Sequence, residues 1–401
     1  MFFYNPMEPS YVRDPYPMLH RMREEDPVHY FAPAGTWFLT RYADIWSLMR
    51  DTRALSLPAD QMSVGAGNKK RDEGPFQRAM RKWIVLMNPP DHTRVRNLLN
   101  KSFTPKVIAR IDERVVEIAD ELLDNVLQKR EVDLMREYTN PLPMLVVAGQ
   151  LGVPKEDRPR IKIWSDAIAN AMDPIKGYAY RAEGDKATLE MFAYLRDVVE
   201  DRKRSPREDL LSLMITAEEA GDRLSMEELL ATSMLLLFAG NETTTGLLGN
   251  SIAALIDNRD QEELLRARPS IMPTAVEEFL RYETPSHTTG RVLSTDMEIG
   301  GKLIKQGSRV ICILGAANRD PAVFEDPDIL DLRREDNKHI AFGTGHHFCL
   351  GNHLARLEAR IALQRLLERT KRFELTERNI QWRDTVALRG PKALPMRLTP
   401  A

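Results

Sequence analysis

The sequence predicts a mainly α-helical fold with a small β region. Three patterns lead to this prediction: one long apolar helix near the middle of the chain, a largely helical stretch from Pro89 to about Glu283, and short strand-like runs near both ends. We find no repeat, low-complexity segment or domain linker in the 401 residues. We therefore expect a single domain that spans residues 1–401.

The long helix begins with a capping signal. Ser225 and Glu228 have the spacing of a capping box, in which two side chains satisfy free backbone N–H groups of the first turn. Apolar residues then recur on most faces as far as Leu255, and the helical pattern reaches Asn258. Roughly 33 residues at about 1.5 Å each extend over about 50 Å. We expect a helix this long and this apolar to run through the middle of the molecule.

Short strand-like runs flank the helical part. They are rich in β-branched and aromatic residues and are separated by turn signals such as Gly300-Gly301. Strands are expected at Val28–Phe31, Thr36–Thr40, Arg291–Leu293, Met297–Ile299 and Ser308–Leu314, and as short strands near the C-terminus. A helix is expected from about Leu350 to Arg369, and a Gly- and Lys-rich loop over Ser63–Gly74.

The composition excludes several classes of protein. Lys plus Arg is 57 and Asp plus Glu is 59, so the net charge of −2 gives no general attraction to nucleic acid. No apolar run approaches the roughly 20 residues that span a bilayer, and the N-terminus lacks a signal-peptide pattern. Two cysteines are too few for a disulfide scaffold and favour a reducing compartment. We expect a soluble cytoplasmic protein that binds neither nucleic acid nor membranes.

The two cysteines have different surroundings. Cys312 lies in the apolar run Val310–Leu314, where a cysteine is usually a small core residue. Cys349 lies in the Gly- and His-rich stretch Phe342–Gly351, directly before a predicted helix. Glycines let the backbone approach a flat or bulky group, and a helix start stabilises a thiolate through its dipole and free N–H groups. Cys349 is therefore a candidate metal ligand.

Two other interpretations of Cys349 stay open at this point. One is a structural loop with a buried thiol. The other is a zinc site, although a single cysteine beside adjacent histidines has poor spacing for zinc. The further ligands of such a site would be His339, His346, His347 and His353.

A group of polar residues interrupts the long apolar helix at residues 239–244, which read Ala-Gly-Asn-Glu-Thr-Thr. A carboxylate such as that of Glu242 is costly to bury without a partner or a function. A threonine such as Thr243 can bond a preceding carbonyl and bend the helix, which opens a small groove. Taken alone, these residues fit an ordinary helix with back-bonded hydroxyls as well as an active site.

Together, the two stretches resemble the signature motifs of the cytochrome P450 family. Residues 342–351 match every fixed position of the family's haem-binding pattern, Phe-Gly-x-Gly-x-His-x-Cys-x-Gly. Residues 239–244 match the oxygen-activating pattern, Ala/Gly-Gly-x-Asp/Glu-Thr-Thr/Ser. The resemblance extends from about Asp14 to Pro395, and the length without a membrane anchor looks like the soluble bacterial branch. It implies the cytochrome P450 fold, a single domain whose long central helix crosses the haem.

This resemblance implies a haem b cofactor with Cys349 as the iron ligand. It makes Thr243 the residue that bonds the dioxygen and Glu242 the residue that relays protons from solvent. Further haem contacts are implied for Ala239, Gly240, Phe342, Gly343 and Gly351.

Four cations are candidates for the haem propionates. His92 and Arg96 stand four residues apart, so they share one face of a predicted helix and can both reach carboxylates. The resemblance adds Arg291 and His347. Without it, each of the four would be interpreted as a solvated cation.

The resemblance also implies a structural triad. Glu278 and Arg281 share one helix face and would by themselves be an ordinary surface ion pair. They match the family's Glu-x-x-Arg pair, which an arginine in the segment before the cysteine loop completes. Arg334 fits that place, and Arg333 is the alternative. The family often has Phe where Leu330 stands, so this stretch departs slightly from the pattern.

The implied function is that of a haem-thiolate monooxygenase, which inserts one oxygen atom of O2 into an apolar small molecule. Two electrons would come from a separate ferredoxin or flavodoxin with its reductase, so NAD(P)H would act only indirectly. Arg94, Lys101 and Arg356 could steer such a partner, although surface cations are common. We expect a monomer. A peroxide-driven haem-thiolate peroxygenase and a non-catalytic haem-binding sensor are the alternatives.

The substrate is the least determined part of this interpretation. By position in the family, the candidate pocket residues are Leu235, Ala239, Pro285, Ser286, His287, Ala387 and Leu388. We expect an apolar pocket, which a steroid, terpenoid, fatty acid, macrolide or aromatic compound would all fit. His287 could bond a polar substrate group, but a core or solvent-facing role is equally compatible with the sequence.

Overall fold

The structure is a computed structural model that describes residues 5–6, 8–57, 74–172, 179–219, 221–377 and 379–401. Apart from Gly74, the predicted loop over Ser63–Gly74 lies outside the described residues. Backbone contacts divide the chain into two compact units. The first unit comprises residues 1–55, 111–143 and 242–401, and the second comprises residues 56–110 and 144–241. The single domain over residues 1–401 stays a prediction.

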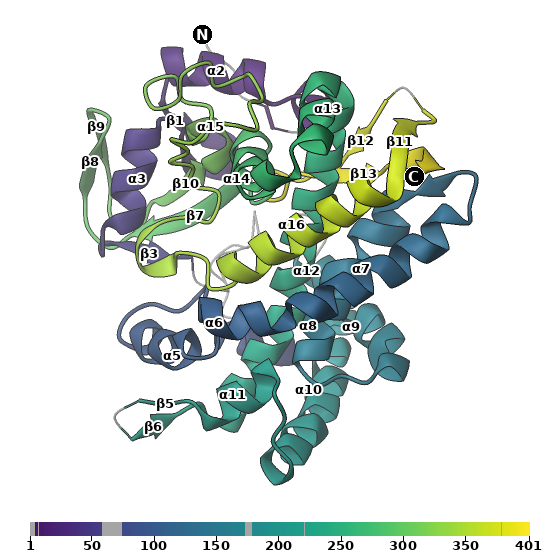
Figure 1. Ribbon diagram of the computed structural model, residues 1–401. Helices are drawn as coiled ribbons and strands as arrows, with labels where there is room; N and C mark the ends of the chain where they lie inside the picture. The colour runs from purple at the N-terminus through teal and green to yellow at the C-terminus, as the bar shows by residue number, and fades with distance from the viewer. Residues whose placement is uncertain (1–4, 7, 58–73, 173–178, 220, 378) are drawn as a thin grey trace. The chain divides into compact units, whose positions relative to one another are not determined.

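Helices make up most of both units, as predicted (Figure 1). The α-helices of the first unit include α1 (Pro9–Arg13), α2 (Tyr16–Glu25), α3 (Tyr42–Arg50), α7 (Asp112–Leu127), α13 (Arg259–Ala267), α14 (Met272–Tyr282), α15 (Leu314–Ala317) and α16 (Asn352–Arg369). The second unit includes α4 (Pro75–Met80), α5 (Asp91–Asn100), α6 (Pro105–Ile108), α9 (Arg158–Met172), α10 (Arg181–Arg204) and α11 (Leu210–Thr216). Helices α8 (Pro141–Gln150) and α12 (Met226–Asp257) contribute residues to both units.

Helix α12 is the predicted long helix, with 32 residues. The capping box is confirmed, because the Ser225 N–H donates to Glu228 Oε2 at 2.8 Å and the Glu228 N–H donates to Ser225 Oγ at 3.2 Å. Leu230, Met234 and Leu248 are completely buried. Burial on several faces explains why the helix lacks the single apolar stripe of a surface helix.

Five strands form the main sheet of the first unit, in the order β1-β2-β10-β7-β3. They are β1 (Val28–Phe31), β2 (Thr36–Leu39), β3 (Ala54–Ser56), β7 (Thr288–Leu293) and β10 (Arg309–Ile313). Strand β10 runs parallel to β2 and antiparallel to β7, which sets Arg291 opposite Val310. Cys312 is completely buried in the core below this sheet, as predicted.

The remaining strands form smaller sheets. Strands β11 (Thr370–Leu375), β14 (Pro395–Pro400) and β4 (Val132–Asp133) pair in the order β11-β14-β4. Two-stranded pairs are formed by β5 (Glu218–Glu219) with β6 (Asp222–Arg223), β8 (Met297–Ile299) with β9 (Lys302–Ile304), and β12 (Gln381–Trp382) with β13 (Pro391–Ala393). The short C-terminal strands expected from the sequence are therefore present.

Several predicted boundaries need correction. The strand expected to end at Thr40 ends at Leu39, the strand expected from Arg291 begins at Thr288, and the strand expected from Ser308 begins at Arg309. The strand expected to reach Leu314 ends at Ile313, because Leu314 already begins the helical turn α15. That turn needs Gly315, since a Cβ atom there would lie 2.2 Å from the His287 ring. The helix expected from Leu350 begins at Asn352, after Gly351 as its N-terminal cap.

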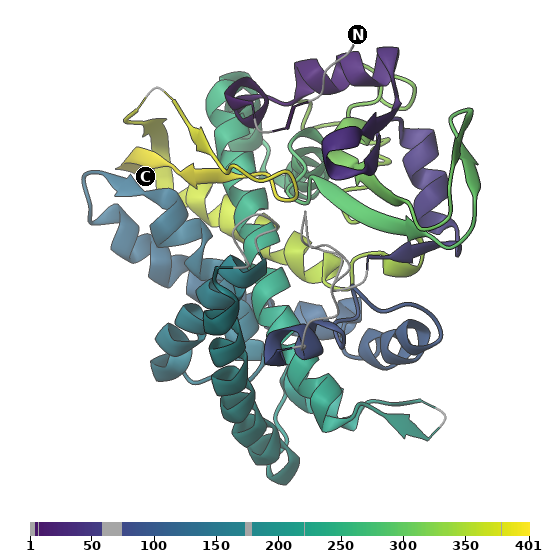
Figure 2. The same cartoon turned by 180° about the vertical axis from the view of Figure 1, so that it is seen from behind.

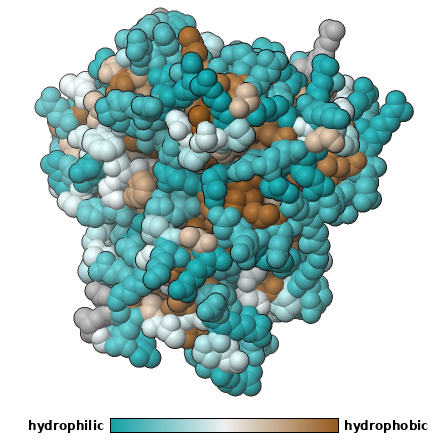
Figure 3. All heavy atoms as spheres, viewed as in Figure 1, coloured by the Kyte–Doolittle hydropathy of each residue, from teal (hydrophilic) through white to brown (hydrophobic). Residues whose placement is uncertain are grey.

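The surface is mostly polar, as the 29% of charged residues would suggest. The face in Figure 3 is largely hydrophilic and shows hydrophobic residues only in scattered patches. Within the described ranges, no helix combines the length and the apolar character needed to cross a membrane.

Candidate active site

The loop around Cys349 depends on two glycines with left-handed backbones. Gly343 has φ 72° and Gly345 has φ 71°, a region that disfavours residues with a Cβ atom. A Cβ atom on Gly345 would also lie 2.6 Å from the Met49 carbonyl oxygen. The loop closes where the Cys349 N–H donates to the Phe342 carbonyl at 2.9 Å. These restraints hold Cys349 in place directly before α16.

Cys349 is half-buried, whereas Cys312 is completely buried. Burial raises the pKa of the Cys312 thiol to about 12, which makes it an inert core residue. Cys349 lies three residues before α16, and the Asn352 side-chain amide donates to its carbonyl oxygen at 2.9 Å. The positive end of a helix dipole favours the thiolate form of a cysteine in this position.

Glu277 and Arg356 brace this loop. Arg356 donates to both Glu277 carboxylate oxygens, at 2.6 and 2.8 Å, and its guanidinium lies 4.5 Å from the centre of the Phe342 ring. Burial alone would raise the pKa of Glu277, but hydrogen bonds from His339 and Arg356 outweigh it and lower this pKa to about 2. We did not anticipate Glu277 from the sequence, where it is simply the residue before Glu278.

The same contacts bear on the zinc alternative. His339 Nε2 lies 3.1 Å from Glu277 Oε2, and its Nδ1 accepts from the Ala341 N–H at 3.2 Å. Both ring nitrogens of His339 are therefore occupied and cannot bind zinc. In the parts of the chain that the structure describes, no three His, Cys, Asp or Glu side chains are grouped as metal ligands.

Glu278 binds two arginines in the interior of the first unit. Glu278 and Arg281 are completely buried and share two hydrogen bonds of 2.7 Å. Arg334 Nε lies 3.2 Å from Glu278, which is the triad geometry expected for Arg334. Arg333 instead pairs with Asp331 at the surface. Arg281 also donates to the carbonyls of Asn318, Pro327 and Ile329, so the triad anchors the segment that leads to the cysteine loop.

The polar group interrupts the burial of α12 in the middle of the helix, although Asn241 and Thr244 within it are buried. Ala239 is exposed, and Gly240, Glu242 and Thr243 are half-buried, whereas residues 244–250 are buried. The Glu242 carboxylate forms an ion pair with Arg383, which lies just after β12. Ala239 and Thr243 therefore remain accessible in the middle of a largely buried helix.

A buried acid that we did not anticipate adjoins this group. Glu358 of α16 is 1% exposed and hydrogen-bonds the Thr244 side chain, which brings α16 against α12 (Figure 1). Burial disfavours the charged carboxylate and raises the pKa of Glu358 well above its usual value. The only sequence signal was an acid between Leu357 and Ala359 on the buried side of a helix.

Arg291 is a buried cation without an acidic counterpart among the described residues. It is 3% exposed and donates only to neutral groups, the Gly290 carbonyl at 2.8 Å and Thr289 Oγ1 at 3.3 Å. Burial lowers the pKa of its guanidinium. Because a buried charge is costly without a partner, Arg291 fits a ligand carboxylate such as a haem propionate.

The other propionate candidates fall in both units. His347 is half-buried in the short turn before Cys349, in the first unit with Arg291. His92 and Arg96 lie on α5 of the second unit, where His92 is 2% exposed and Arg96 Nε donates to Asn100 at 2.9 Å. Two of the four candidates thus belong to each unit.

Five pocket candidates meet in the first unit. The His287 N–H donates to the Ala387 carbonyl at 2.9 Å, and Ser286 pairs with Leu388 as an isolated β-bridge next to the buried Pro285. Burial lowers the pKa of His287 to about 3, with Arg389 and Arg319 adding to the effect. Its ring is 3% exposed, which favours the core role over a solvent-facing one. Leu235 is buried and Ala239 exposed in the second unit.

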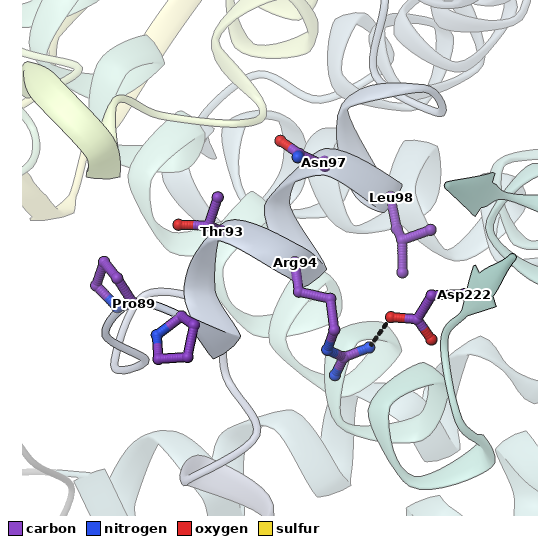
Figure 4. A pocket seen from close by; sticks show the side chains of 7 residues that line it. Pro89, Thr93, Arg94, Asn97, Leu98 and Asp222 are labelled. Carbon is purple, nitrogen blue, oxygen red and sulfur yellow. Dashed lines mark hydrogen bonds and ion pairs between the residues drawn. The ribbon is translucent and has the colours of Figure 1, made fainter. Parts of the chain in front are cut away.

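The cations expected to steer a redox partner already have contacts within the chain. Arg94 pairs with Asp222 and Glu228, Lys101 donates to the Glu218 carbonyl, and Arg356 pairs with Glu277. Arg94 also lines an open surface pocket of about 720 Å³ beside α5, where its ion pair with Asp222 is drawn as a dashed line (Figure 4). None of the predicted catalytic or haem-contacting residues lines this pocket.

Comparison with known proteins agrees with this geometry. A family model described as "Cytochrome P450" matches residues 174–385. The biotin biosynthesis cytochrome P450 of Bacillus subtilis is 35% identical over 390 residues, which cover 96% of this chain and 97% of that protein. The chain belongs to the cytochrome P450 family.

Other cytochromes P450 are equally similar. The vitamin D(3) 25-hydroxylase of Pseudonocardia autotrophica is 38% identical over 398 residues, which cover 98% of this chain and 95% of the relative. The structure of P450BioI in complex with an acyl carrier protein ligated to hexadec-9Z-enoic acid aligns with a TM-score of 0.89 and 33% identity, over 97% and 99% of the two chains. The fold is thus that of a cytochrome P450, and the family implies haem as the cofactor.

The residues present fit that cofactor. A half-buried thiol at a helix start, a buried arginine without an acidic partner among the described residues, and an uncovered stretch of α12 all belong to the first unit or to the helix that enters it. This cytochrome P450 is an enzyme of the monooxygenase class, as its named relatives are.

Proposed function

We propose that this chain inserts one oxygen atom of O2 into an apolar small molecule. The overall reaction takes up O2, two electrons and two protons, and it returns the hydroxylated substrate and one water. The observation that carries the proposal is the thiol of Cys349, half-buried at the start of α16 within a loop that two left-handed glycines shape. Haem b, when bound, supplies the redox chemistry.

In this proposal the chain's own residues bind, orient and deliver protons. Cys349 is the iron ligand, and Arg291 with His347 in the first unit and His92 with Arg96 in the second neutralise the propionates. Thr243 and Glu242 pass protons from solvent towards the oxygen. The half-buried position of both residues on α12 suits a relay with one end near water.

Electrons come from a separate ferredoxin or flavodoxin with its reductase, and NAD(P)H serves only that reductase. Arg94, Lys101 and Arg356 contribute to the docking of this donor, since none of the three is buried. Lys101 is exposed, while Arg94 and Arg356 are half-buried. We also propose that the protein acts as a monomer in the cytoplasm.

The proposed substrate is apolar, and its contacts include Leu235, Ala239 and the cluster of Pro285, Ser286, Ala387 and Leu388. Two relatives point in this direction without choosing a compound. One is named for vitamin D(3), and the other was captured with a fatty acid carried on an acyl carrier protein. Their common feature is a long apolar skeleton, which a mostly apolar pocket can bury.

The test is a pair of spectroscopic and turnover measurements. We expect the purified haem-loaded protein to give the carbon monoxide difference band of thiolate-bound iron, and an apolar substrate to shift the ferric Soret band to high spin. With ferredoxin, reductase and NAD(P)H, isotopically labelled O2 should place one labelled atom in the product. Turnover with peroxide alone would instead identify a peroxygenase, and ligand binding without any product would identify a sensor.

A further inference from the structure

Glu242 is held by a cation from a distant part of the chain. Its carboxylate forms an ion pair with Arg383, and the two side chains are 23% and 22% exposed. The pair therefore borders solvent without being fully hydrated. Among the described residues, Arg383 is the cation paired with this acid, and nothing in the sequence pattern around residue 383 suggested a role near α12.

The β12–β13 hairpin fixes the position of Arg383. The Arg383 N–H donates to the Gly390 carbonyl at 3.0 Å, which closes the loop at its base. At the other side of the loop, the Arg389 guanidinium lies 3.8 Å from the centre of the Trp382 ring, and the Arg389 N–H donates to the Pro285 carbonyl at 2.7 Å. Arg383 is thus the first residue of a loop with several anchors.

That loop packs directly on α12, one to two turns beyond Glu242. The Asn250 side-chain amide donates to the Arg389 carbonyl at 3.2 Å. A Cβ atom on Gly246 would lie 3.0 Å from the same carbonyl, so the helix and the loop approach as closely as a glycine permits. Figure 2 shows the hairpin, in yellow, lying beside this half of α12. The separation between Arg383 and Glu242 is therefore set by packed backbone.

A neighbouring ion pair on the same hairpin does not involve α12. Lys392 pairs with Asp384, and both side chains are about half exposed. Besides Arg389, which pairs with Glu283, the hairpin thus carries two cations with different partners: Arg383 binds the acid of α12, and Lys392 binds an acid of the hairpin itself. Lys392 provides a matched control for the removal of a positive charge from this element.

We propose that Arg383 is a positioning residue that holds the Glu242 carboxylate at the solvent end of the proton path. The proposal rests on the proposed function, because it assumes that Glu242 relays protons. Water gives a proton to the carboxylate, Glu242 passes it on towards Thr243, and solvent restores the balance. Arg383 neither gains nor loses a proton. It restricts the many rotamers of a free glutamate to those that meet the Arg383 guanidinium.

The test compares Arg383→Gln, Glu242→Gln and the double variant, with Lys392→Gln as control. We expect Arg383→Gln to lower the rate of product formation about tenfold, to leave KM nearly unchanged and to increase the kinetic solvent isotope effect. Arg383→Lys should recover part of the rate. In the Glu242→Gln background, Arg383→Gln should have no further effect, because a positioning residue acts only through its partner. Lys392→Gln should behave like the wild type.

Hydrogen–deuterium exchange gives a readout that does not depend on turnover. We expect Arg383→Gln and Glu242→Gln each to increase exchange in residues 381–393, by similar amounts, and Lys392→Gln not to increase it near α12. Thermal unfolding shows whether each variant is folded before its rate is interpreted.

Independent effects of Arg383→Gln and Glu242→Gln would overturn the inference, and so would a faster proton step in Arg383→Gln. If the wild type gives neither the thiolate carbon monoxide band nor product, the proposed function is wrong. If the wild type meets both criteria and Arg383→Gln matches it in rate and isotope effect, only the inference about Arg383 is wrong.

Discussion

Glu358 of α16 hydrogen-bonds Thr244 of α12, the residue that directly follows Thr243. Two acids therefore adjoin the threonines of α12 in different surroundings. Glu242 is partly exposed and paired with Arg383, whereas Glu358 is buried and its pKa is raised.

The buried acid predicts an unusual pH dependence of stability. The pKa of Glu358 is raised in the folded state. The contribution of Glu358 to the stability of the protein is therefore fully present below the unfolded-state pKa of about 4.3, and it is lost as pH rises towards the folded-state pKa. Glu358→Gln removes this titration. We expect the variant to gain about 1.4 kcal/mol relative to the wild type for each pH unit within that interval.

Denaturant unfolding of the haem-loaded protein between pH 4 and pH 8 measures this difference. Glu368→Gln, on the same helix but exposed and paired with Arg365, is the control and should follow the wild type. Parallel stability curves for Glu358→Gln and the wild type would show that Glu358 is not buried in its neutral form.

Glu277 should give the opposite pH dependence of stability. Hydrogen bonds from His339 and Arg356 lower the pKa of Glu277 to about 2 against the cost of burial. Its contribution to stability is therefore present above about pH 4.3 and is lost as pH falls towards 2. We expect Glu277→Gln to be less stable than the wild type by about 2 to 3 kcal/mol at pH 7, and the two to converge below pH 3.

Unfolding followed by circular dichroism across this range checks the convergence. Asp331→Asn removes a more exposed ion pair, with Arg333, and should cost less than about 1 kcal/mol. A Glu277→Gln deficit that persists unchanged at acid pH would assign the loss to packing and not to charge.

The cysteines predict different spectra. Cys349→Ser should abolish the carbon monoxide difference band of thiolate-bound iron, because a hydroxyl is a poor substitute for a thiolate ligand. Cys312→Ala should retain the band, since Cys312 is a neutral core residue whose loss costs only packing. Absorption spectra of equal amounts of haem-loaded protein provide the measurement. A normal band in Cys349→Ser would remove the basis of the active-site assignment.

Replacement of Thr243 should uncouple product formation from NAD(P)H consumption. We expect Thr243→Ala to lower product formation by about 10- to 100-fold while NAD(P)H consumption continues and peroxide accumulates, because protons then reach the oxygen without control. Thr245→Val is a matched change on the same helix, where the hydroxyl donates to the Thr139 carbonyl at 3.2 Å. It should reduce stability and leave the ratio of product to NAD(P)H intact. The measurement is the ratio of product formed to NAD(P)H consumed in each variant. Equal ratios in the two variants would show that Thr243 is not part of the proton path.

Some features could be predicted because their cause is local. The capping box of Ser225 and Glu228, the left-handed glycines before Cys349 and the i, i+3 contact of Glu278 with Arg281 each depend on residues close in sequence. The haem-binding loop and the α12 motif are continuous segments as well, so their patterns indicated the family before any fold was known.

Other features could not be predicted, since their partners are far apart in the chain. In the sequence, Arg356 looks like an ordinary surface cation. Only the packing of α14 against α16 brings it to its ion-pair partner Glu277. The sequence was equally compatible with His287 as a substrate contact and as a core residue. Its burial in the structure favours the core role.

The sequence by itself determined the family, the cofactor that the family implies and the segments that carry the chemistry. It could do so because the motifs that indicate them are short runs of neighbouring residues. Only the tertiary structure decided how the acids are held: Arg383 on Glu242, Thr244 on Glu358 and Arg356 on Glu277. A side chain's charge state depends on burial and on the partner that packing brings to it, and neither quantity exists until distant segments have folded together.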